Sequence, residues 1–277
     1  MAWSAIQNKE AAKDDATFDS TPSVNSLIVV VLSTWEGSIG ASDISDNQGN
    51  TYTRAVYSDN SGVNVGIFYA IATTSSGSFV VSNDGGQGDY SIGIHEFTGN
   101  ATSSVLSQNA SDTGQSTTPN SGNITSSDAN EELFFGTQSH DGANLAQTEG
   151  SGWTEMIDFP DGSSHMPLHT QYKTSTGTDA SDHTIGDWQN WVCLIASFEP
   201  LAEGTTTSTT TTSTSTTTTT STTSTSTSTT SISTTSTSTT TTLTSTTTTS
   251  TSTTSTRPAQ RQHQPRRRRP AQRQHQP

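Results

Sequence analysis

The sequence predicts an all-β protein, an antiparallel two-sheet sandwich with the strand order of a jelly roll. Short runs rich in Val, Ile, Thr, Phe and Tyr recur between clusters of Gly, Asn, Asp and Ser. Helical periodicity is hard to find in these runs. Roughly ten short strands with turn signals between them favour two packed antiparallel sheets.

Individual runs predict where the strands lie. Residues 26–35, SLIVVVLSTW, form an unbroken run rich in β-branched side chains, which predicts a central strand buried on both faces. Residues 63–74 alternate between larger apolar and mostly small side chains, which predicts a half-buried strand. Further strands are expected at residues 78–82, 90–97, around 124, and at 132–139, 153–157, 168–174 and 191–198.

Composition divides the 277 residues into a body and two low-complexity parts. Residues 1–203 have the mixture of side chains that one β-sandwich domain needs. Residues 205–256 are Ser and Thr except for Ile232 and Leu243, so we expect residues 204–256 to be a disordered stalk. Such tracts are typical of O-glycosylation, with Thr205 and Ser208 as its first candidates; an unmodified flexible linker is the alternative.

The tail, residues 257–277, contains only Arg, Pro, Ala, Gln and His and repeats RPAQRQHQP. A basic run usually indicates nucleic acid or an anionic membrane. However, codons for Arg, Pro, Gln and His can all begin with C, and a one-base shift turns them into codons for Ser, Pro, Thr or Ala. We therefore expect a disordered tail that continues the Ser/Thr tract in a shifted reading frame, with a real basic element as the alternative.

Charge limits the partners of the body. All 25 acidic residues but only four of the eleven basic ones lie in it, which makes its charge −21 although the whole chain carries −14. Such a surface repels nucleic acid and anionic lipid and suits cations or neutral partners. The longest apolar run, residues 27–32, is too short to span a bilayer. The single cysteine, Cys193, lies in an apolar run and is interpreted as a buried small hydrophobe.

The segment SDISDNQGNTYTRA, residues 42–55, poses a choice between a calcium loop and a turn. Asp43 and Asp46 supply carboxylates, but an EF-hand pattern would place a ligand at Ile44, five residues before Gly49. We therefore favour a hairpin turn at residues 46–50 between strand arms at 42–45 and 51–53. Bound Ca²⁺ is the alternative, and no other cofactor is expected.

Two histidines form a second metal candidate. His165 and His169 in HMPLH would share one face of a strand, with two aspartates just upstream. Pro167 disturbs strand pairing, and no third ligand has diagnostic spacing. Two ordinary surface histidines are therefore favoured over a transition-metal site.

No set of residues predicts catalysis. His95 and Glu96 lie in YSIGIHEFTG, where Glu96 has no partner carboxylate by motif, whereas a glycosidase needs two. The sequence also contains no Gly-x-Ser-x-Gly elbow. We expect a non-catalytic protein and keep a glycan-active enzyme as the least favoured alternative.

Tryptophans are the candidate ligand-binding residues. Exposed indoles serve sugar-binding sandwiches as apolar platforms beside polar side chains. The candidates in this sequence are Trp188, Trp191, Asp187, Asn190 and Trp35. The alternative is that Trp191 and Trp153 belong to the core or the sheet end. Three sequons, at Asn100, Asn109 and Asn123, are candidate N-glycosylation sites if the host modifies asparagine.

Several short motifs carry a family resemblance. In order they are WSAIQ, NSLIVVV, DNQGNTY, IFYA, IGIHEFTG, NEELFFG, GSGWT and WVCLIASF. This series resembles a loosely defined group of secreted bacterial β-sandwich modules of large surface proteins, similar to concanavalin-type lectin domains. The resemblance covers residues 3–199 and implies the fold, without an attached activity.

Together these observations predict an extracellular or cell-surface module that binds carbohydrate or another surface polymer on a Ser/Thr stalk. The N-terminus lacks the apolar core of a secretory signal, so another export route, an upstream start or a virion location is required. The alternative is a structural subunit of an extracellular fibre or virion appendage that self-assembles, with residues 2–7 pairing at a neighbour's sheet edge.

Overall fold

The computed structural model describes residues 2–35, 37–74, 76–127, 131–142, 145–160 and 166–202. Within these ranges the protein is all-β and its strand pairs are antiparallel, which confirms the predicted fold class. One short 3₁₀ turn, η1 (Ala41–Asp43), is the helical segment of this part. The predicted stalk and tail, with Thr205, Ser208 and also His165, lie outside the described residues.

The first half of the body forms one five-stranded and one three-stranded sheet. The larger has the order β1-β8-β3-β6-β5 and the smaller the order β2-β7-β4. The strands are β1 (Ser4–Ala12), β2 (Ala16–Thr17), β3 (Leu27–Trp35), β4 (Ile44–Asp46), β5 (Thr53–Asn60), β6 (Val63–Ile71), β7 (Val80–Asn83) and β8 (Tyr90–Thr98).

The second half repeats this arrangement. Its sheets have the orders β13-β14-β11-β16-β9 and β10-β15-β12. The strands are β9 (Leu106–Ser116), β10 (Asn120–Thr125), β11 (Glu132–His140), β12 (Gln147–Glu149), β13 (Thr154–Phe159), β14 (Leu168–Ser175), β15 (Thr178–Ile185) and β16 (Gln189–Phe198). When β9 is matched to β1 and the others follow in sequence, both sheets of the second half have the strand order of the first.

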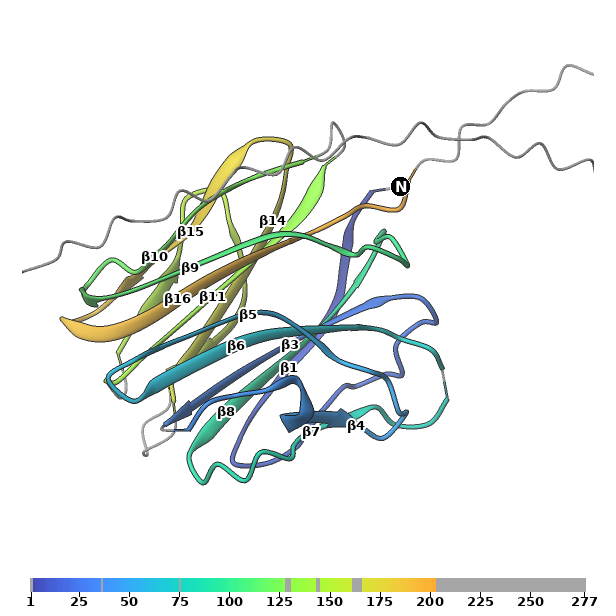
Figure 1. The fold of residues 1–277 in the computed structure, drawn as a ribbon, viewed down its shortest axis with the longest axis horizontal. Helices are drawn as coiled ribbons and strands as arrows, with labels where there is room; N and C mark the ends of the chain where they lie inside the picture. Colours follow the sequence, from blue (N-terminus) through green and yellow to red (C-terminus); the bar gives the residue numbers. More distant parts are fainter. Residues whose placement is uncertain are drawn as a thin grey trace, which may run out of the picture. The chain divides into compact units, whose positions relative to one another are not determined.

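The body is therefore an internal duplication rather than a single jelly roll. In each half, four strands of the large sheet and three of the small sheet follow jelly-roll order, while β5 and β13 join the large sheet at its edge. Figure 1 shows the first half in blue to teal below the second half in green to orange.

Strand irregularities support the duplication. β1 bulges at Ile6 against β8, and β9 bulges at Ser107 against β16. β5 bulges at Ala55 against β6, and β13 bulges at Met156 against β14. Because a bulge re-aims the side chains that follow it and is kept as a specific feature of a fold, coincident bulges indicate two copies of one unit.

The registers identify equivalent positions in the two halves. Phe68 pairs with Arg54 beside the β5 bulge, and Gln171 pairs with Glu155 beside the β13 bulge. Counted from these pairs, Gln171 takes the place of Phe68. By the same register His169 takes the place of Gly66, and Glu155 that of Arg54. Ser33 and Ser139 are equivalent too, and the hydroxyl of Ser33 donates a 2.8 Å hydrogen bond to that of Ser139.

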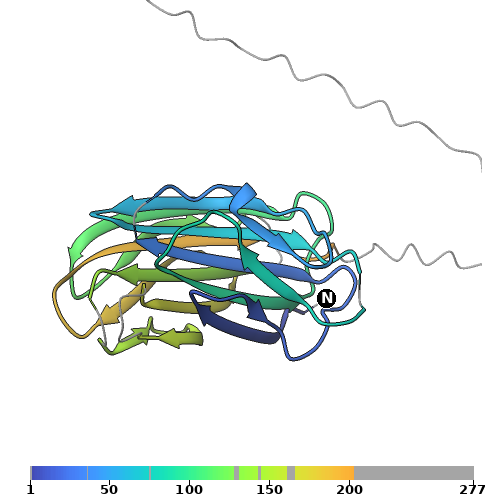
Figure 2. The ribbon, with the colours of Figure 1, turned by 90° about the horizontal axis from the view of Figure 1, so that it is seen from below.

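The main core lies between the two five-stranded sheets. Its buried side chains come from strands of both halves, among them Val29, Ile67, Phe135 and Leu194. Figure 2 shows these sheets seen from below. As predicted, β3 is central in its sheet and is buried from Leu27 to Thr34.

A second apolar core covers the outer face of the first sheet. Ile28, Val30 and Phe68 pack there against Phe79 and Val81 and their neighbours from the small sheet and its loops. This layer explains why the prediction of a half-buried strand at residues 63–74 was wrong. Gly66, Phe68 and Ala70 lie on the face that was expected to be exposed, and the small sheet buries it.

The outer face of the second sheet is covered by a largely polar layer. Gln138, His169, Gln171, Ser181 and His183 are at most 3% exposed. Two small apolar clusters flank them, one around Phe134 and Trp153 and one around Ile185 and Trp191. Cys193, buried as predicted, donates a 3.3 Å hydrogen bond to the carbonyl of Ser181.

Two further expectations need correction. Residues 42–45 and 51–53 do not form a hairpin, because β4 pairs with β7 and β5 pairs with β6 in a different sheet. The segment 46–50 is a turn, but it connects two layers. Residues 4–7 already pair with β8 inside the chain, so the N-terminal segment is an edge strand of its own sheet and can meet a neighbour only along its other edge.

Candidate functional site

One end of the sandwich carries two exposed indoles. Trp188, in the turn between β15 and β16, is 60% exposed, and Trp35, at the end of β3, is 39% exposed. The end of β3, the β5–β6 turn and the start of β16 gather at the same end, on the left in Figure 1. Asn60 connects two of these segments, because its amide donates hydrogen bonds to the carbonyls of Gly114 and Trp191.

The polar residues predicted beside Trp188 are held by short bonds. Asp187 accepts a 2.7 Å hydrogen bond from the backbone N–H of Trp188. Asn190 donates from its backbone and its side chain to the two carboxylate oxygens of Asp141, at 3.0 and 2.6 Å. Asp141 was not singled out from the sequence because nothing in the sequence places it beside β16. These contacts fix the backbone on both sides of an exposed ring.

Trp191 does not share that exposure. It is 6% exposed, its ring packs over Gly114, and its indole N–H donates a 2.9 Å hydrogen bond to the hydroxyl of Ser116. Trp153, 7% exposed, is likewise a core residue. The available platform therefore consists of Trp188 and Trp35, because Trp191 lies within β16, where every residue from 191 to 198 is buried.

The carboxylate of Asp46 is occupied by protein donors. One oxygen accepts from the backbone N–H groups of Gln48 and Asn50, and the other from the Asn50 amide and the Tyr52 hydroxyl. Asp43 accepts from the backbone N–H of Gly40. Gly49 has φ of +77°, a left-handed conformation that glycine adopts without strain. These bonds support the turn interpretation of this segment.

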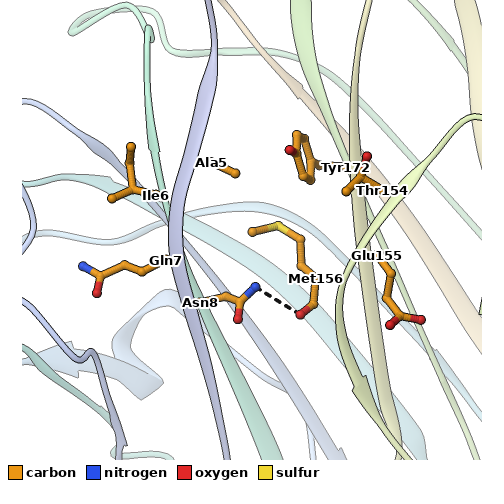
Figure 3. Close-up of a pocket in the computed structure, with 8 residues that line it drawn as sticks. All are labelled: Ala5, Ile6, Gln7, Asn8, Thr154, Glu155, Met156 and Tyr172. Carbon is orange, nitrogen blue, oxygen red and sulfur yellow. Dashed lines mark hydrogen bonds between the residues drawn. The ribbon is translucent and has the colours of Figure 1, made fainter.

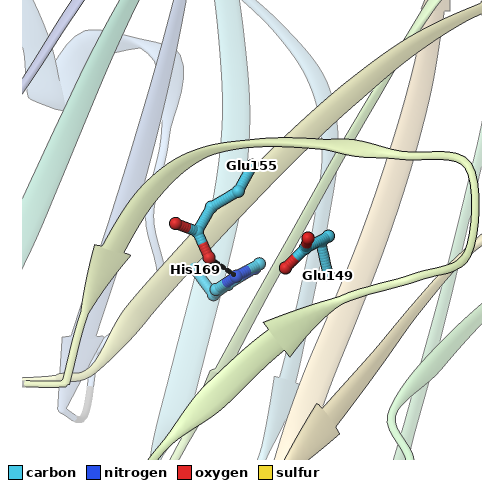
Figure 4. A group of neighbouring side chains, drawn as sticks. All are labelled: Glu149, Glu155 and His169. Carbon is cyan, nitrogen blue, oxygen red and sulfur yellow. Dashed lines mark hydrogen bonds and ion pairs between the residues drawn. The ribbon is translucent and has the colours of Figure 1, made fainter.

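A second candidate site lies where β12, β13 and β14 meet. Glu149, Glu155 and His169 place one carboxylate or imidazole atom each within 4.8 Å of the others. Figure 4 shows both carboxylates directed at the buried ring of His169. Glu155 lies 3.2 Å from Nε2 of His169. Only His169 of this group was among the predicted metal residues, because the two glutamates come from strands that the sequence does not place together.

Behind His169 runs a chain of buried hydrogen bonds. Nδ1 of His169 lies 3.0 Å from Nδ1 of His183, whose Nε2 lies 2.7 Å from the hydroxyl of Ser181. Gln171 donates from its amide to the same hydroxyl, and its oxygen accepts from the backbone N–H of Gly150. A Ser–His–His–Glu series has the groups of a catalytic relay, yet Ser181 is 0% exposed. No substrate reaches its hydroxyl, so we assign the chain to the orientation of His169.

Burial and charge set the protonation of this layer. Burial lowers the pKa of His169 and, together with the neighbouring ring of His169, that of His183. The carboxylate of Asp158 accepts a 3.2 Å hydrogen bond from Gln147. Partial burial raises the pKa of Asp158, and His169 opposes that rise. The rings are neutral at pH 7, while several carboxylates crowd the rim.

His95 and Glu96 have structural positions. Glu96 is 1% exposed and accepts hydrogen bonds from the Gln7 amide and the backbone N–H of Ser23, which holds the segment before β3. His95 is fully buried in the main core, with its ring edge against Phe135. Neither ring nitrogen of His95 has a hydrogen-bond partner among the described residues. The hydrogen-bond partners of the Glu96 carboxylate are thus an amide and a backbone N–H, not a second carboxylate of the kind that a glycosidase uses.

A groove opens between the edge strands β1 and β13. It has a volume of about 220 Å³ and is lined by Ala5, Ile6, Gln7, Asn8, Thr154, Glu155, Met156 and Tyr172. Figure 3 shows Asn8 spanning it with a 3.0 Å hydrogen bond to the carbonyl of Met156. Glu155 borders both this groove and the cluster at His169.

The sequons differ in accessibility. Asn100 is 4% exposed, and its amide donates to the carbonyls of Asn25 and Ala101, so its nitrogen is not available to a glycan. Asn109 in β9 and Asn123 in β10 are exposed.

The fold and these sites define a duplicated, all-β module with an exposed aromatic end and an acidic–histidine cluster. No family model, no curated protein and no solved structure matches this chain. No helix in the residues that the structure describes is long and apolar enough to cross a membrane.

Proposed function

We propose that the body is a non-catalytic module that binds carbohydrate or another neutral surface polymer outside the cell, presented on the Ser/Thr-rich stalk. The exposed indole of Trp188 carries this proposal. An indole that is 60% exposed leaves a large apolar face in water, and tryptophan is enriched at interaction surfaces. The pyranose ring of a sugar offers a complementary C–H face.

The surroundings of Trp188 fit a polyhydroxylated ligand. Asp187, Asp141 and Asn190 present hydrogen-bonding groups beside the indole, in backbone segments fixed by the bonds described above. Trp35 gives the same end a second apolar face. The body charge of −21 opposes polyanions and leaves neutral polymers as the favoured partners.

The test is a pull-down of the full-length chain on insoluble and immobilised polysaccharides, with the Trp188→Ala and Trp35→Ala variants beside it. Val24→Ala is the matched control, because Val24 is 51% exposed and precedes β3, whereas Trp35 ends it. We expect at least about a fivefold loss of binding for Trp188→Ala, since one stacked ring contributes about 1–3 kcal/mol in comparable aromatic platforms. Equal binding by all variants, or binding to no polymer, would reject the proposal.

A second candidate function is self-assembly into a fibre, and the open edge of β1 favours it. β1 pairs with β8 on one side, and Ile6 on this edge strand is 49% exposed. Exposed edges are templates for pairing with another chain. Sedimentation of the purified protein at rising concentration tests this function. Assembly that Ile6→Lys abolishes would support it, and a monomer throughout would remove it.

A further inference from the structure

The cluster at β12, β13 and β14 combines donors suited to a transition metal. One imidazole nitrogen and two carboxylates, each from a different strand, lie within 4.8 Å of one another. Zn²⁺ binds imidazole and carboxylate at about 2.0–2.2 Å, which sets tetrahedral ligand atoms roughly 3–4 Å apart. The two glutamates are exposed and free to close this difference, while buried His169 is fixed.

A buried acceptor beside His169 gives an independent indication of a ligand. Gln138 lies directly across from His169 in the β11–β14 pairing and is 0% exposed. Its amide nitrogen donates to Gln147, but its Oε1 has no partner among the residues described. An unsatisfied buried carbonyl costs about 1–3 kcal/mol, and water bound to a metal at His169 is a donor that would satisfy it.

The outer shell already has the form that a ligating histidine needs. Such a histidine donates its second ring N–H to a fixed acceptor. When Nε2 of His169 faces a metal, Nδ1–H donates to Nδ1 of His183, and Nε2–H of His183 donates to the hydroxyl of Ser181. In each ring the single proton moves from one nitrogen to the other, so the number of protons on the two histidines is unchanged.

Charge and the internal duplication both set this cluster apart. No Lys or Arg pairs with Glu149 or Glu155 within the described ranges, and Asp158 adds a third carboxylate nearby. In the first half, the places of Glu155 and His169 are taken by Arg54 and Gly66. The jelly-roll layer therefore folds without this donor set, and its presence in one half calls for a ligand.

We infer that Glu149, Glu155 and His169 bind one divalent transition-metal ion of the Zn²⁺ type. Three donors leave a coordination position for water or for a ligand atom, as at metal sites that bind exogenous groups. Ca²⁺ fits less well, because it takes six to eight oxygen ligands, whereas one of the three donors in this cluster is an imidazole nitrogen. The site is separate from the Trp188 surface, so either can fail without the other.

Calorimetric titration of the full chain with Zn²⁺ alone tests the inference. All proteins carry His263→Ala and His275→Ala, which removes the tail histidines as competing ligands. We expect one Zn²⁺ per chain and no heat with Ca²⁺. Glu149→Gln and Glu155→Gln each weaken Zn²⁺ binding at least tenfold, whereas Glu10→Gln, an exposed residue of β1 in the other sheet, does not.

The two glutamates keep the test independent of folding, because both substitutions exchange an exposed carboxylate for an amide of the same size. Circular dichroism verifies the fold of each variant. Replacement of Zn²⁺ by Co²⁺ adds visible d–d absorption whose intensity reports the coordination geometry at the bound ion. Zn²⁺ binding that both glutamine variants retain, or no Zn²⁺ binding by the parent protein, would overturn the inference. Unchanged Zn²⁺ binding by Trp188→Ala would show that the two sites are independent.

Discussion

The two outer layers of the molecule have the same strand order and opposite chemistry. In the first half, Phe68 on the large sheet packs in an apolar layer with Phe79 and Val81 of the small sheet. In the second half, Gln171 takes the place of Phe68 and bonds to Gly150, Ser181 and His183. The comparison teaches that this topology does not require an apolar layer, provided that the buried polar groups find partners. Because the main core and the first outer layer supply apolar burial, the second outer layer can hold polar side chains of the kind that bind ligands.

Lowering the pH should have the largest effect on the free energy of unfolding. It acts through His95 and His140, whose equivalents in the opposite half are not titratable residues. Burial lowers the pKa of His95 to about 3 and that of His140 to about 4, although Asp141 opposes the shift at His140. By register their equivalents are Ala196 and Thr34. Unfolded histidine has a pKa of about 6.5. Below that pH the unfolded chain binds more protons, so the free energy of unfolding falls as pH falls.

Between pH 7 and pH 4.5 these two histidines together should remove about 5 kcal/mol from the free energy of unfolding. Urea denaturation at both pH values measures this loss. His140→Thr introduces the residue of the other half and should reduce the measured loss by about 2–3 kcal/mol, the share of one of the two histidines. A pH profile that this substitution leaves unchanged would contradict the assignment to His140.

Removal of an apolar side chain from the first layer should have the next largest effect. Phe68→Ala leaves a cavity in a packed apolar layer and should lower the free energy of unfolding by about 3–5 kcal/mol. Urea denaturation at pH 7 gives the value. A loss below about 1 kcal/mol would mean that apolar packing contributes little to the stability of the first layer. The contrast between the two outer layers would then disappear.

Gln171→Leu tests whether the second layer depends on hydrogen bonds. The backbone N–H of Gly150 loses its acceptor, and the hydroxyl of Ser181 loses a donor. We expect a loss of about 1–3 kcal/mol, smaller than for Phe68→Ala because leucine recovers apolar burial. Hydrogen exchange should show faster opening of β12 and β15 but not of β4 and β7. A more stable variant would show that polarity is not needed for stability at this position.

His95→Leu should have the smallest effect and the opposite sign. The ring is fully buried against Phe135, and neither nitrogen has a partner within the described part of the chain. Leucine of similar volume removes the cost of desolvation and should raise the free energy of unfolding by about 1–2 kcal/mol. Destabilisation instead would indicate that the ring holds a contact outside the described residues.

The sequence predicted the strands that contain runs of apolar side chains, because such runs can be recognised locally. All nine predicted strands overlap observed ones, including β3, the central strand of its sheet, and β16, an interior strand. The missed strands include β1, β9 and β15, which read as polar or alternating-polar segments such as LSQNASDTGQS. They are edge strands of a large sheet or part of the polar outer layer, where backbone pairing and side-chain hydrogen bonds replace apolar contacts.

The duplication left weak traces that could have revealed it. GNTYTRAV and GSGWTEMI contain the equivalent bulges at Ala55 and Met156, and QN occurs at equivalent places in β1 and β9. TTSSGS follows β6, and the similar KTSTGT spans the end of its equivalent, β14. These matches consist mostly of turn residues and lie about 100 positions apart. A search for repeats of 20–50 residues passes over them.

The sequence by itself determined the class of fold, the acidic charge of the body and the candidates Trp188, Trp35 and His169, because these depend on residue type and local period. Only the tertiary structure decided that Trp191 is buried while Trp188 is exposed, that Asp46 is saturated by its own turn, and that two glutamates from β12 and β13 meet His169. Such placements depend on which strands pair across more than ten intervening residues. That pairing is set by the packing of whole layers, which no short window of sequence contains.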